Sequence, residues 1–474
     1  MDNKDFRQQA HLLVDWMADY LENIEQFPVK SKVKPYEIYQ QLPEQMPEQG
    51  ENFSHIMEDF QQLLLPGITH WQHPNFHAYF PANSSYPSVL GEMLTATLGA
   101  QCMIWDTSPA AAELEEKVMN WLKIAFHLPE TWEGVIQDTA STATLTALLS
   151  AREQATHFQS NKKGLQKAHW RVYCSTETHS SIEKGVKIIG LGKDNLVKIA
   201  TTGHGCMDPQ ALEEAIQADL AAGWQPMCVV AALGTTGTTA VDPLAPIAAI
   251  CQKYQIWLHL DAAFAGVALL LPEYHYLLQG IEQVDSFVTN AHKWLFTNFD
   301  CSLYYVKDKE ALLKTFEILP EYLKTSSRGA VNDYRDWGVP LGRRFRALKL
   351  WFVLRTYGLE GLQTRLREHL QLAQTFAQWI EEAPDFECLA PVEFSLVCFR
   401  YKPLGTWTEE QLEAQNKELL ELLNQSGEVY LTHTKIGKQY ALRLVTAQTY
   451  VQLHHVEKAW NLIQHYARKK PQVE

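Results

Sequence analysis

The sequence predicts an α/β fold: a mostly parallel central sheet covered by helices, with a helical arm before it and a small α+β domain after it. From about residue 86 to 310, short β-rich runs alternate with helical stretches, which is the pattern of strands joined by crossover helices. These runs are apolar on both faces, as expected for strands that helices cover on each side. The length of 474 residues exceeds what one compact core accommodates, so more than one domain is expected.

The expected elements follow in order along the chain. Five runs are expected to form strands, at residues 170–175, 227–233, 256–261, 285–290 and 302–306. Helices are expected between them at 142–155 and 244–254, and before them at 1–27 and near 52–65. After them we expect one or two long helices within 341–385, strands at 393–401 and 440–447, and helices around 408–425 and 451–468. The chain should therefore have three parts: an N-terminal helical arm (1–85), a large domain (86–360) and a small C-terminal α+β domain (361–474).

Composition narrows the class of partner. There are 55 acidic and 41 basic residues, a formal net charge of -14, which disfavours non-specific nucleic-acid binding. No apolar stretch reaches the length of a membrane span, and the charged N-terminus lacks the apolar core of a signal peptide. The eight cysteines are scattered without a C-x-x-C pair, so we expect reduced thiols and no zinc site. Together these features indicate a cytoplasmic protein that contacts neither nucleic acid nor membrane.

Two ionisable residues end neighbouring apolar strands. Lys293 follows the run 285–290, and desolvation at such a place would expose a neutral amine for Schiff-base chemistry. Asp261 ends the run 256–261, where a carboxylate needs a partner such as a protonated ring nitrogen. Taken singly, Lys293 is more simply a surface lysine and Asp261 a helix cap or an ion pair. One crossover unit between them would bring both to the same edge of the sheet.

Three further groups follow strands or begin helices. Residues 139–142 (Thr-Ala-Ser-Thr) precede a helix, where hydroxyl and backbone N–H groups can bind phosphate or simply cap the helix. Residues 234–239 (Gly-Thr-Thr-Gly-Thr-Thr) form a second small, hydroxyl-rich loop. His179 follows the run 170–175 and could stack on a flat ring. A lysine, an acid, a phosphate cradle and a stacking ring are the parts that pyridoxal 5′-phosphate (PLP) requires.

Longer motifs carry a family resemblance. They are HPNFHAYFPANSSYPSVLGEML, SPAAAELE, THSSIEKG, LGTTGTT, HLDAAFAG, NAHKW, PLGRRFRALKLWFVLRTYG and SGEVYLTHT. From about residue 5 to 465 the chain resembles the PLP-dependent group II decarboxylases, specifically the aromatic-L-amino-acid decarboxylases. The resemblance implies the type I PLP-dependent (aspartate aminotransferase-like) fold, with PLP bound by the large domain. It also implies a homodimer in which the N-terminal helices clasp the other subunit.

The resemblance also implies roles for individual residues. Lys293 would form the Schiff base with PLP, and Asp261 would contact the pyridine nitrogen. His179 and Ala263 would lie against opposite faces of the ring. The phosphate would be held by Ala140, Ser141 and Asn290, with Thr236 and His292 also near the cofactor.

Substrate contacts are implied in the same way. The aromatic pocket of the family corresponds to Trp71, Tyr79, Phe80, Pro81 and Ala82. Met103 and Gln101 fall where the family has apolar residues contributed across the dimer, and the polar Gln101 departs from that pattern. Gly342 falls where histidine decarboxylases carry serine, and its small size favours a phenol, catechol or indole over imidazole. Tyr322 would lie in a mobile loop and donate a proton to the carbanion carbon.

The function that follows is PLP-dependent decarboxylation of an aromatic L-amino acid to its amine. DOPA, tryptophan, tyrosine and phenylalanine remain open as substrates. One alternative is an aromatic aldehyde synthase, which the presence of His179 and Tyr322 disfavours. A decarboxylase of glutamate or aspartate is a second, although HPNFHAYFPA offers no arginine for a distal carboxylate. A catalytically dead scaffold is a third. No G-x-G-x-x-G follows any strand, which argues against a nicotinamide enzyme.

Overall fold

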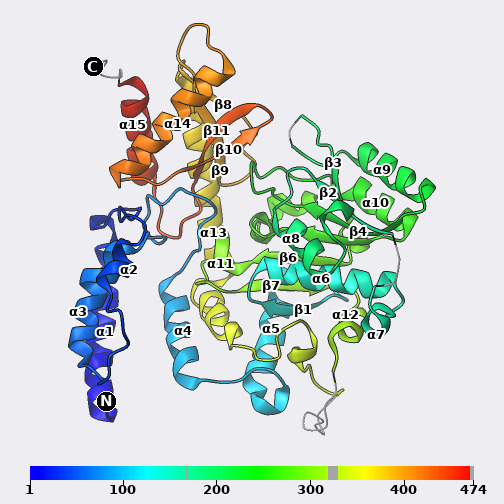
Figure 1. Cartoon of the computed structure of the whole chain (residues 1–474), viewed down its shortest axis with the longest axis horizontal. Helices are drawn as coiled ribbons and strands as arrows, with labels where there is room; N and C mark the ends of the chain where they lie inside the picture. Colours follow the sequence, from blue (N-terminus) through cyan, green and yellow to red (C-terminus); the bar gives the residue numbers. More distant parts are fainter. Residues whose placement is uncertain (166–168, 204, 319–328, 470–474) are drawn as a thin grey trace. The chain divides into compact units, whose positions relative to one another are not determined.

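The chain divides into two compact units in this computed structural model, which describes residues 1–165, 169–203, 205–318 and 329–469 (Figure 1). Unit 1 contains residues 1–81, 372–389 and 397–474, and unit 2 contains residues 82–371 and 390–396. The three-part division with boundaries at 85 and 360 stays a prediction.

Unit 2 is built on a sheet whose seven described strands run in the order β1-β7-β6-β5-β4-β2-β3. Strand β7 pairs antiparallel with β6 and with β1, and the other pairs are parallel. The strands are β1 (Glu133–Gln137), β2 (Trp170–Ser175), β3 (Leu196–Ile199), β4 (Gln225–Ala232), β5 (Trp257–Asp261), β6 (Ser286–Asn290) and β7 (Ser302–Val306). Every residue of β5, β6 and β7 is buried. The expected mostly parallel, doubly covered sheet is confirmed.

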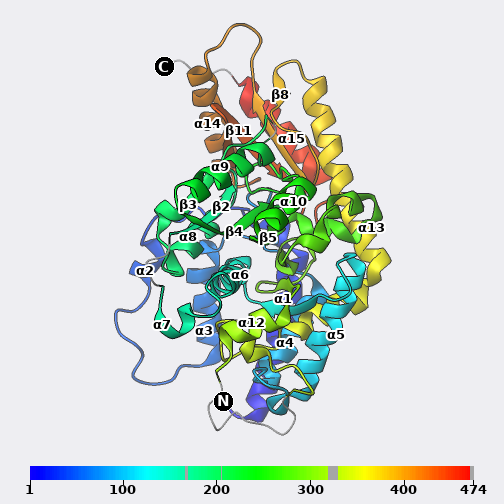
Figure 2. The same cartoon turned by 90° about the vertical axis from the view of Figure 1, so that its right-hand side faces the viewer.

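Helices cover both faces of this sheet. Helix α6 packs on the sheet with α8 and α12 beside it, and α9 and α10 lie together on the other side (Figure 2). The helices of unit 2 are α4 (Tyr86–Leu98), α5 (Pro109–Ala125), α6 (Ala140–Ala155), α7 (Ser160–Lys163), α8 (Ser181–Ile188), α9 (Pro209–Ala221), α10 (Leu244–Tyr254), α11 (Ala291–Trp294) and α12 (Lys309–Phe316). Short 3-10 helices lie at Trp105–Thr107, Lys193–Asn195, Ala265–Leu270, Pro272–Leu278, Ile281–Gln283 and Tyr334–Asp336.

The long helix α13 (Arg346–Glu382) is interrupted at Gly358, which has φ 63° and ψ 174°. The expectation of one or two long helices in this region therefore resolves into two helical segments joined at one residue. The second segment enters unit 1 at residue 372.

Unit 1 contains a small four-stranded sheet in the order β10-β11-β9-β8. Its strands are β8 (Phe386–Cys388), β9 (Leu396–Tyr401), β10 (Thr432–Ile436) and β11 (Gln439–Val445), with antiparallel pairing of β8 to β9 and of β10 to β11. The helices of the unit are α1 (Asn3–Glu22), α2 (Glu37–Gln41), α3 (Phe53–Asp59), α14 (Glu409–Ser426) and α15 (Leu453–Arg468). The first helix was expected at 1–27 but is shorter in the structure. It ends at Glu22, and a 3-10 turn (Ile24–Gln26) follows before Pro28.

The expectations on membrane spans and cysteines can be compared directly with the structure. Within the described ranges, none of the helices has the length and apolar character needed to cross a bilayer. All eight cysteines are free thiols; six are buried, and Cys206 and Cys388 are half-buried.

Candidate active site at the carboxyl edge of the sheet

The chemically distinctive side chains gather where the parallel strands of unit 2 end. Asp261 is the last residue of β5 and Asn290 the last of β6, and Lys293 follows in α11. His179 lies four residues beyond β2, just before α8. Because β7 runs antiparallel, its first residue, Ser302, lies at the same edge, opposite Asn290. Ligands of open α/β sheets bind at this edge.

His179 interacts electrostatically with two of the other three predicted catalytic residues, Asp261 and Lys293. Burial lowers the pKa of His179, the carboxylate of Asp261 raises it in part, and the ammonium of Lys293 lowers it further. Nδ1 of His179 accepts the backbone N–H of Ser181 at 3.1 Å. The neutral ring therefore carries its proton on Nε2. The structure thus brings His179, Asp261 and Lys293 together as the sequence predicted.

Asp261 is a buried carboxylate that is only partly satisfied. It is 8% exposed, and its Oδ1 accepts the Ala263 N–H at 3.1 Å. Among the described residues its Oδ2 has no hydrogen-bond partner. An ionised oxygen in this position needs a positively charged donor, because burying an unpaired charge is costly. A protonated ring nitrogen satisfies that need.

Lys293 is half-buried. Hydrogen bonds from residues 83–85 hold the backbone around it. The Asn83 side-chain amide donates to the Lys293 carbonyl at 2.5 Å, and the Asn83 N–H donates to the His292 carbonyl at 2.9 Å. The Ser85 hydroxyl donates to the Phe296 carbonyl at 2.6 Å. Sequence reasoning missed Asn83 and Ser85, since no local pattern connects them to residues about 210 positions away.

The N-terminus of α6 offers donors for an anion. Thr139 caps the helix, with its Oγ1 accepting the Thr142 N–H at 3.4 Å. The N–H groups of Ala140 and Ser141, the first two of the helix, have no partner among the described residues. The helix dipole adds partial positive charge at this end. These two N–H groups are therefore free to bind an anion, and the role of Ala140 and Ser141 in holding the phosphate stays a prediction.

Asn290 is oriented by the antiparallel strand. The Ser302 hydroxyl donates to the Asn290 side-chain oxygen at 2.5 Å and also contacts the carbonyl of Asp138 at 3.3 Å. With its oxygen occupied by Ser302, the Asn290 amide can present its N–H groups to a ligand at the edge. Ser302 is a second residue that sequence reasoning missed, because β7 was not expected to run against its neighbours.

The other predicted cofactor neighbours differ in accessibility. His292 is buried, and its Nδ1 accepts the Cys301 N–H at 3.0 Å while its ring lies 4.7 Å from that of Phe299. Burial lowers the pKa of His292 to about 3, with Lys293 adding to the effect, so the ring is neutral. Thr236 is exposed in the loop after β4, and Ala263 is half-buried just beyond Asp261.

Three of the predicted substrate-binding residues lie in the aromatic region of unit 1. The rings of Trp71 and Tyr79 stack at 5.8 Å, and Tyr79 lies 6.0 Å from Tyr430 in an edge-on arrangement. The guanidinium of Arg443 lies 5.3 Å from the Phe80 ring. Pro81 is the last residue of this unit's first segment, and Ala82 begins unit 2. Tyr430 and Arg443 were not anticipated from the sequence.

The remaining predicted substrate residues form one cluster in unit 2. The Cys102 N–H donates to the Arg343 carbonyl at 3.0 Å, and the Arg343 N–H donates to Gln101 Oε1 at 2.7 Å. A Cβ added at Gly342 would lie 3.3 Å from Gln101 Nε2. Gln101 therefore covers the space that Gly342 leaves. The Met103 carbonyl accepts the N–H of Arg335 at 2.9 Å.

Tyr322, the predicted proton donor, lies outside the described residues. Its role stays a prediction.

One cluster in unit 1 brings potential metal ligands close together. Atoms of Glu25, His454 and His455 lie within 4.8 Å of one another. However, Nδ1 of His455 accepts the Gln452 N–H at 2.9 Å, so the neutral ring keeps its proton on Nε2, which lies 3.3 Å from Glu25 Oε1. A hydrogen bond between histidine and glutamate accounts for this cluster without a metal.

The chain is similar to known proteins along nearly its whole length. The pyridoxal-dependent decarboxylase conserved domain matches residues 35–402. Phenylacetaldehyde synthase of Arabidopsis thaliana is 43% identical over 98% of this chain and 96% of its own length. Tyrosine decarboxylase 2 of Narcissus pseudonarcissus is 42% identical over 98% of this chain and 95% of its own length. The crystal structure of Catharanthus roseus tryptophan decarboxylase in complex with L-tryptophan superposes with a TM-score of 0.93 at 40% identity, covering 98% of both chains.

Proposed function

Because the chain belongs to the pyridoxal-dependent decarboxylase family, we propose that it converts an aromatic L-amino acid into the corresponding arylalkylamine and CO₂. The structural observation that carries the proposal is Asp261, a buried acid whose Oδ2 has no partner among the described residues. Asp261 and Lys293 both interact electrostatically with His179. This set of groups fits PLP: an acid for the ring nitrogen, an amine for the aldehyde, and a helix N-terminus for the phosphate.

Each residue of the edge has a separate task in this proposal. Bound PLP supplies a protonated pyridine ring that accepts the electron pair released when a carboxylate leaves as CO₂. Lys293 provides the amine that holds the cofactor, and Asp261 keeps the ring nitrogen protonated. The Nε2–H of His179 is available to orient the substrate carboxylate. Ala140, Ser141 and Asn290 hold the phosphate, with Thr236 and His292 nearby and Ala263 against the ring face opposite His179.

The aromatic side chains at residues 71–80 of unit 1 support an aromatic substrate. Trp71, Tyr79 and Phe80, which with Pro81 and Ala82 we propose as the pocket wall, offer flat apolar surface to a ring. Asn83, three residues beyond Phe80 in the sequence, bonds to the backbone of Lys293 within unit 2. We propose that Met103 and Gly342 complete the pocket of the other subunit.

An aromatic aldehyde synthase is the second candidate. Of the two similar proteins named above, one is an aldehyde synthase and the other a decarboxylase. A synthase would release aldehyde, ammonia and peroxide, whereas a decarboxylase releases the amine. His179 is retained with an oriented, neutral ring, and Tyr322 is present in the sequence. We therefore favour the decarboxylase, with Tyr322 donating the proton to the substrate carbon.

A homodimer is part of the proposal. Tyr86, Leu90, Leu94 and Leu98 recur every four residues on α4 and are 45–63% exposed, which leaves an apolar stripe that a second copy can cover. In unit 1, α1 and α3 line an apolar groove with Leu12, Leu13, Trp16, Phe53 and Met57.

Eight free thiols suit a reducing compartment, so we place the enzyme in the cytoplasm.

One experiment tests the function. Wild-type protein loaded with PLP is given DOPA, tyrosine, tryptophan and phenylalanine in turn, and CO₂, amine, aldehyde and peroxide are measured for each. We expect CO₂ and amine in equal amounts from at least one acid. Lys293→Ala should lose activity and borohydride-trappable cofactor, and Tyr322→Phe should bind PLP but shift product toward aldehyde. Peroxide released in step with CO₂ by the wild type would instead establish the synthase.

A further inference from the structure

The backbone that carries Lys293 is one helical turn, too short to be stable by itself. Helix α11 has only four residues (Ala291–Trp294), and the Leu295 N–H closes it by donating to the Ala291 carbonyl at 3.2 Å. The last carbonyls of a helix have no partner within it, so those that follow Ala291 depend on donors from outside the turn. The surroundings of α11 therefore decide where the Lys293 backbone lies.

Asn83 supplies two of these donors. Its side-chain amide donates to the Lys293 carbonyl at 2.5 Å, and its backbone N–H donates to the His292 carbonyl at 2.9 Å. Asn83 is completely buried, so water does not compete for either bond. The two carbonyls flank the Lys293 Cα, one on each side along the chain. The pair of bonds therefore fixes both the position of this Cα and the direction in which its side chain leaves the backbone.

Two serines that follow in the sequence anchor this contact to a longer helix. The Ser85 hydroxyl donates to the Phe296 carbonyl at 2.6 Å, and the Ser88 hydroxyl donates to the Asn298 side-chain oxygen at 2.8 Å. Both serines are buried. Ser85 is the N-cap of α4, a helix of 13 residues, and Ser88 lies in its first turn. Asn83 is thus held two residues before a helix and is not part of a free loop.

The other side chains of α11 are packed in place. Ala291, His292 and Trp294 are buried, whereas Lys293 is half-buried. The Trp294 indole N–H donates to His369 Nδ1 at 3.0 Å, and the Trp294 ring stacks on another aromatic ring, that of Phe264, at 4.9 Å. Within this turn, the Lys293 side chain is therefore the one that can extend toward a ligand, from a backbone whose place is fixed.

We propose that Asn83 is a positioning residue for Lys293, holding its backbone so that the amine reaches the aldehyde carbon of PLP. The inference rests on the proposed function, in which Lys293 forms a Schiff base. In that step the lysine nitrogen bonds to the aldehyde carbon, and the aldehyde oxygen leaves as water with the two amine hydrogens. Placing a reacting group wrongly by about 1 Å costs on the order of 100-fold in rate. Asn83 thus acts on the reaction through Lys293 and not through the cofactor.

The test measures how fast full-length protein stripped of cofactor forms a borohydride-trappable adduct with PLP. Asn83→Ala removes the side-chain donor and keeps the backbone N–H, and the rate should fall by about 10- to 100-fold. Asn83→Ser keeps a shorter donor and should give an intermediate rate. Pyridoxamine 5′-phosphate carries an amine in place of the aldehyde and cannot react with Lys293. Its affinity, measured by equilibrium dialysis, should be the same in both variants as in the wild type.

A double-mutant cycle determines whether Asn83 acts through Lys293. The Lys293→Ala protein cannot form the Schiff base and binds PLP through its ring and phosphate alone. Adding Asn83→Ala to this protein should leave the affinity for PLP unchanged, whereas the same change in the wild type should weaken it. Equal weakening in both proteins would mean that Asn83 supports the fold of the site and nothing more, which would overturn the proposal.

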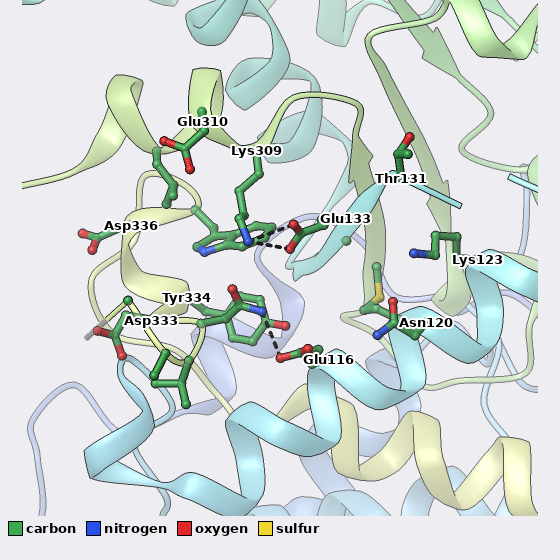
Figure 3. A pocket seen from close by; sticks show the side chains of 18 of the residues that line it. Glu116, Asn120, Lys123, Thr131, Glu133, Lys309, Glu310, Asp333, Tyr334 and Asp336 are labelled. Carbon is green, nitrogen blue, oxygen red and sulfur yellow. Dashed lines mark hydrogen bonds and ion pairs between the residues drawn. The ribbon is translucent and has the colours of Figure 1, made fainter. Parts of the chain in front are cut away.

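Two control variants remove structural interactions away from the PLP edge. Asn416→Ala removes a buried amide that donates to the Tyr401 carbonyl at 2.8 Å in unit 1. Glu133→Gln weakens the pairing of Glu133 with Lys309, which are 2.8 Å apart in the pocket at the opposite edge of the unit 2 sheet (Figure 3). Both variants should form the PLP adduct at the wild-type rate, even where the melting temperature falls. Slowing as large as that of the test variant would reject a specific role.

Failure of the premise is distinguishable from failure of the inference. A borohydride-trappable adduct in Lys293→Ala would refute the role of Lys293 and the positioning role with it. Loss of the adduct in Lys293→Ala, together with wild-type rates in Asn83→Ala and Asn83→Ser, would refute only the role of Asn83. If Asn83→Ala does not fold, the rate measured for Asn83→Ser decides between these outcomes.

Discussion

The proposed chemistry depends on a few residues whose surroundings change their ordinary behaviour. Asp261 is buried and its Oδ2 has no hydrogen-bond partner among the described residues, whereas desolvation lowers the pKa of His179 and favours its neutral ring. Both residues could be predicted from the sequence because polar groups that end apolar strands meet at one edge of a parallel sheet. Asn83, Ser302 and Tyr430 could not, since each acts on a residue distant in sequence and none stands in a pattern of its own.

Asp261→Asn tests the role of the carboxylate. Asparagine keeps the shape and an acceptor for the Ala263 N–H but carries no charge to hold a proton on the cofactor ring. We expect kcat to fall by on the order of 100-fold or more, as when other preorganised charge-stabilising groups are removed. Amine production by the PLP-loaded variant measures this directly.

Asp285→Asn is the matched control for that measurement. Asp285 is a half-buried acid at the other edge of the sheet, where it accepts the Leu258 N–H at 2.8 Å. Its replacement should alter stability and leave kcat per folded enzyme within a few-fold of wild type. Equal losses of kcat in both variants would contradict the proposal that Asp261 keeps the cofactor ring protonated.

At the scale of elements, the sequence predicted those with strong local signals. The strands at 170–175 and 302–306 and the helix at 244–254 have the expected bounds. The short strands β1, β3, β8 and β10 were not expected, because runs such as Leu-Val-Lys-Ile and Thr-His-Thr-Lys-Ile are brief or polar. The reversed direction of β7 was also unpredictable, since pairing direction is set by long-range contacts that no local run contains.

The loop after β4 depends on a glycine for its approach to the site. Gly234 has φ +91°, and a Cβ there would lie 2.7 Å from that of Ala265, two residues beyond Ala263. Gly234→Ala should combine backbone strain with overpacking and cost about 2–4 kcal/mol of unfolding free energy. It should also weaken PLP binding, because Ala265 and the adjoining segment must move. Urea denaturation and a PLP titration measure the two effects.

Comparison with Gly99→Ala separates the cost of backbone strain in Gly234→Ala from the cost of its close contact with Ala265. Gly99 has φ +58° with no atom within 4 Å of an added Cβ, so only the backbone cost of about 1–2 kcal/mol is expected. PLP affinity should not change in this variant. If Gly234→Ala proved no more harmful than Gly99→Ala, the close contact with Ala265 would not constrain the loop.

At the scale of the whole molecule, buried histidines set the response to acid. Burial lowers the pKa of His73, His77 and His259 to about 4, and of His292 and His369 to about 3. Each holds fewer protons in the folded chain than in the unfolded chain, where its pKa is near 6.5. Their contribution to stability is therefore complete above pH 6.5 and is lost as the pH falls toward 4.

Two acids, the buried Asp242 and the half-buried Asp285, oppose this trend. Burial raises the pKa of Asp242 and of Asp285 to about 6, so the folded state binds their protons first and gains stability as the pH falls from 6 to 4. Five histidines against two acids leave a difference of about three protons in that range. These seven groups alone should therefore decrease the unfolding free energy by on the order of 4 kcal/mol per pH unit between pH 6 and 4. The lowered pKa values of His70, His433 and His455 act in the same direction.

Urea unfolding of the PLP-loaded protein at closely spaced pH values checks this expectation. His259→Gln is the informative variant, because His259 bonds to Ser286 and Thr144 inside unit 2 and lies away from the proposed substrate contacts. Glutamine does not titrate, so the variant should lose stability at pH 7 and show a slope between pH 6 and 4 that is shallower by about one proton. The exposed His11→Gln should leave both the slope and the stability unchanged. A flat stability profile in the wild type would mean that the buried histidines take up protons without unfolding the chain.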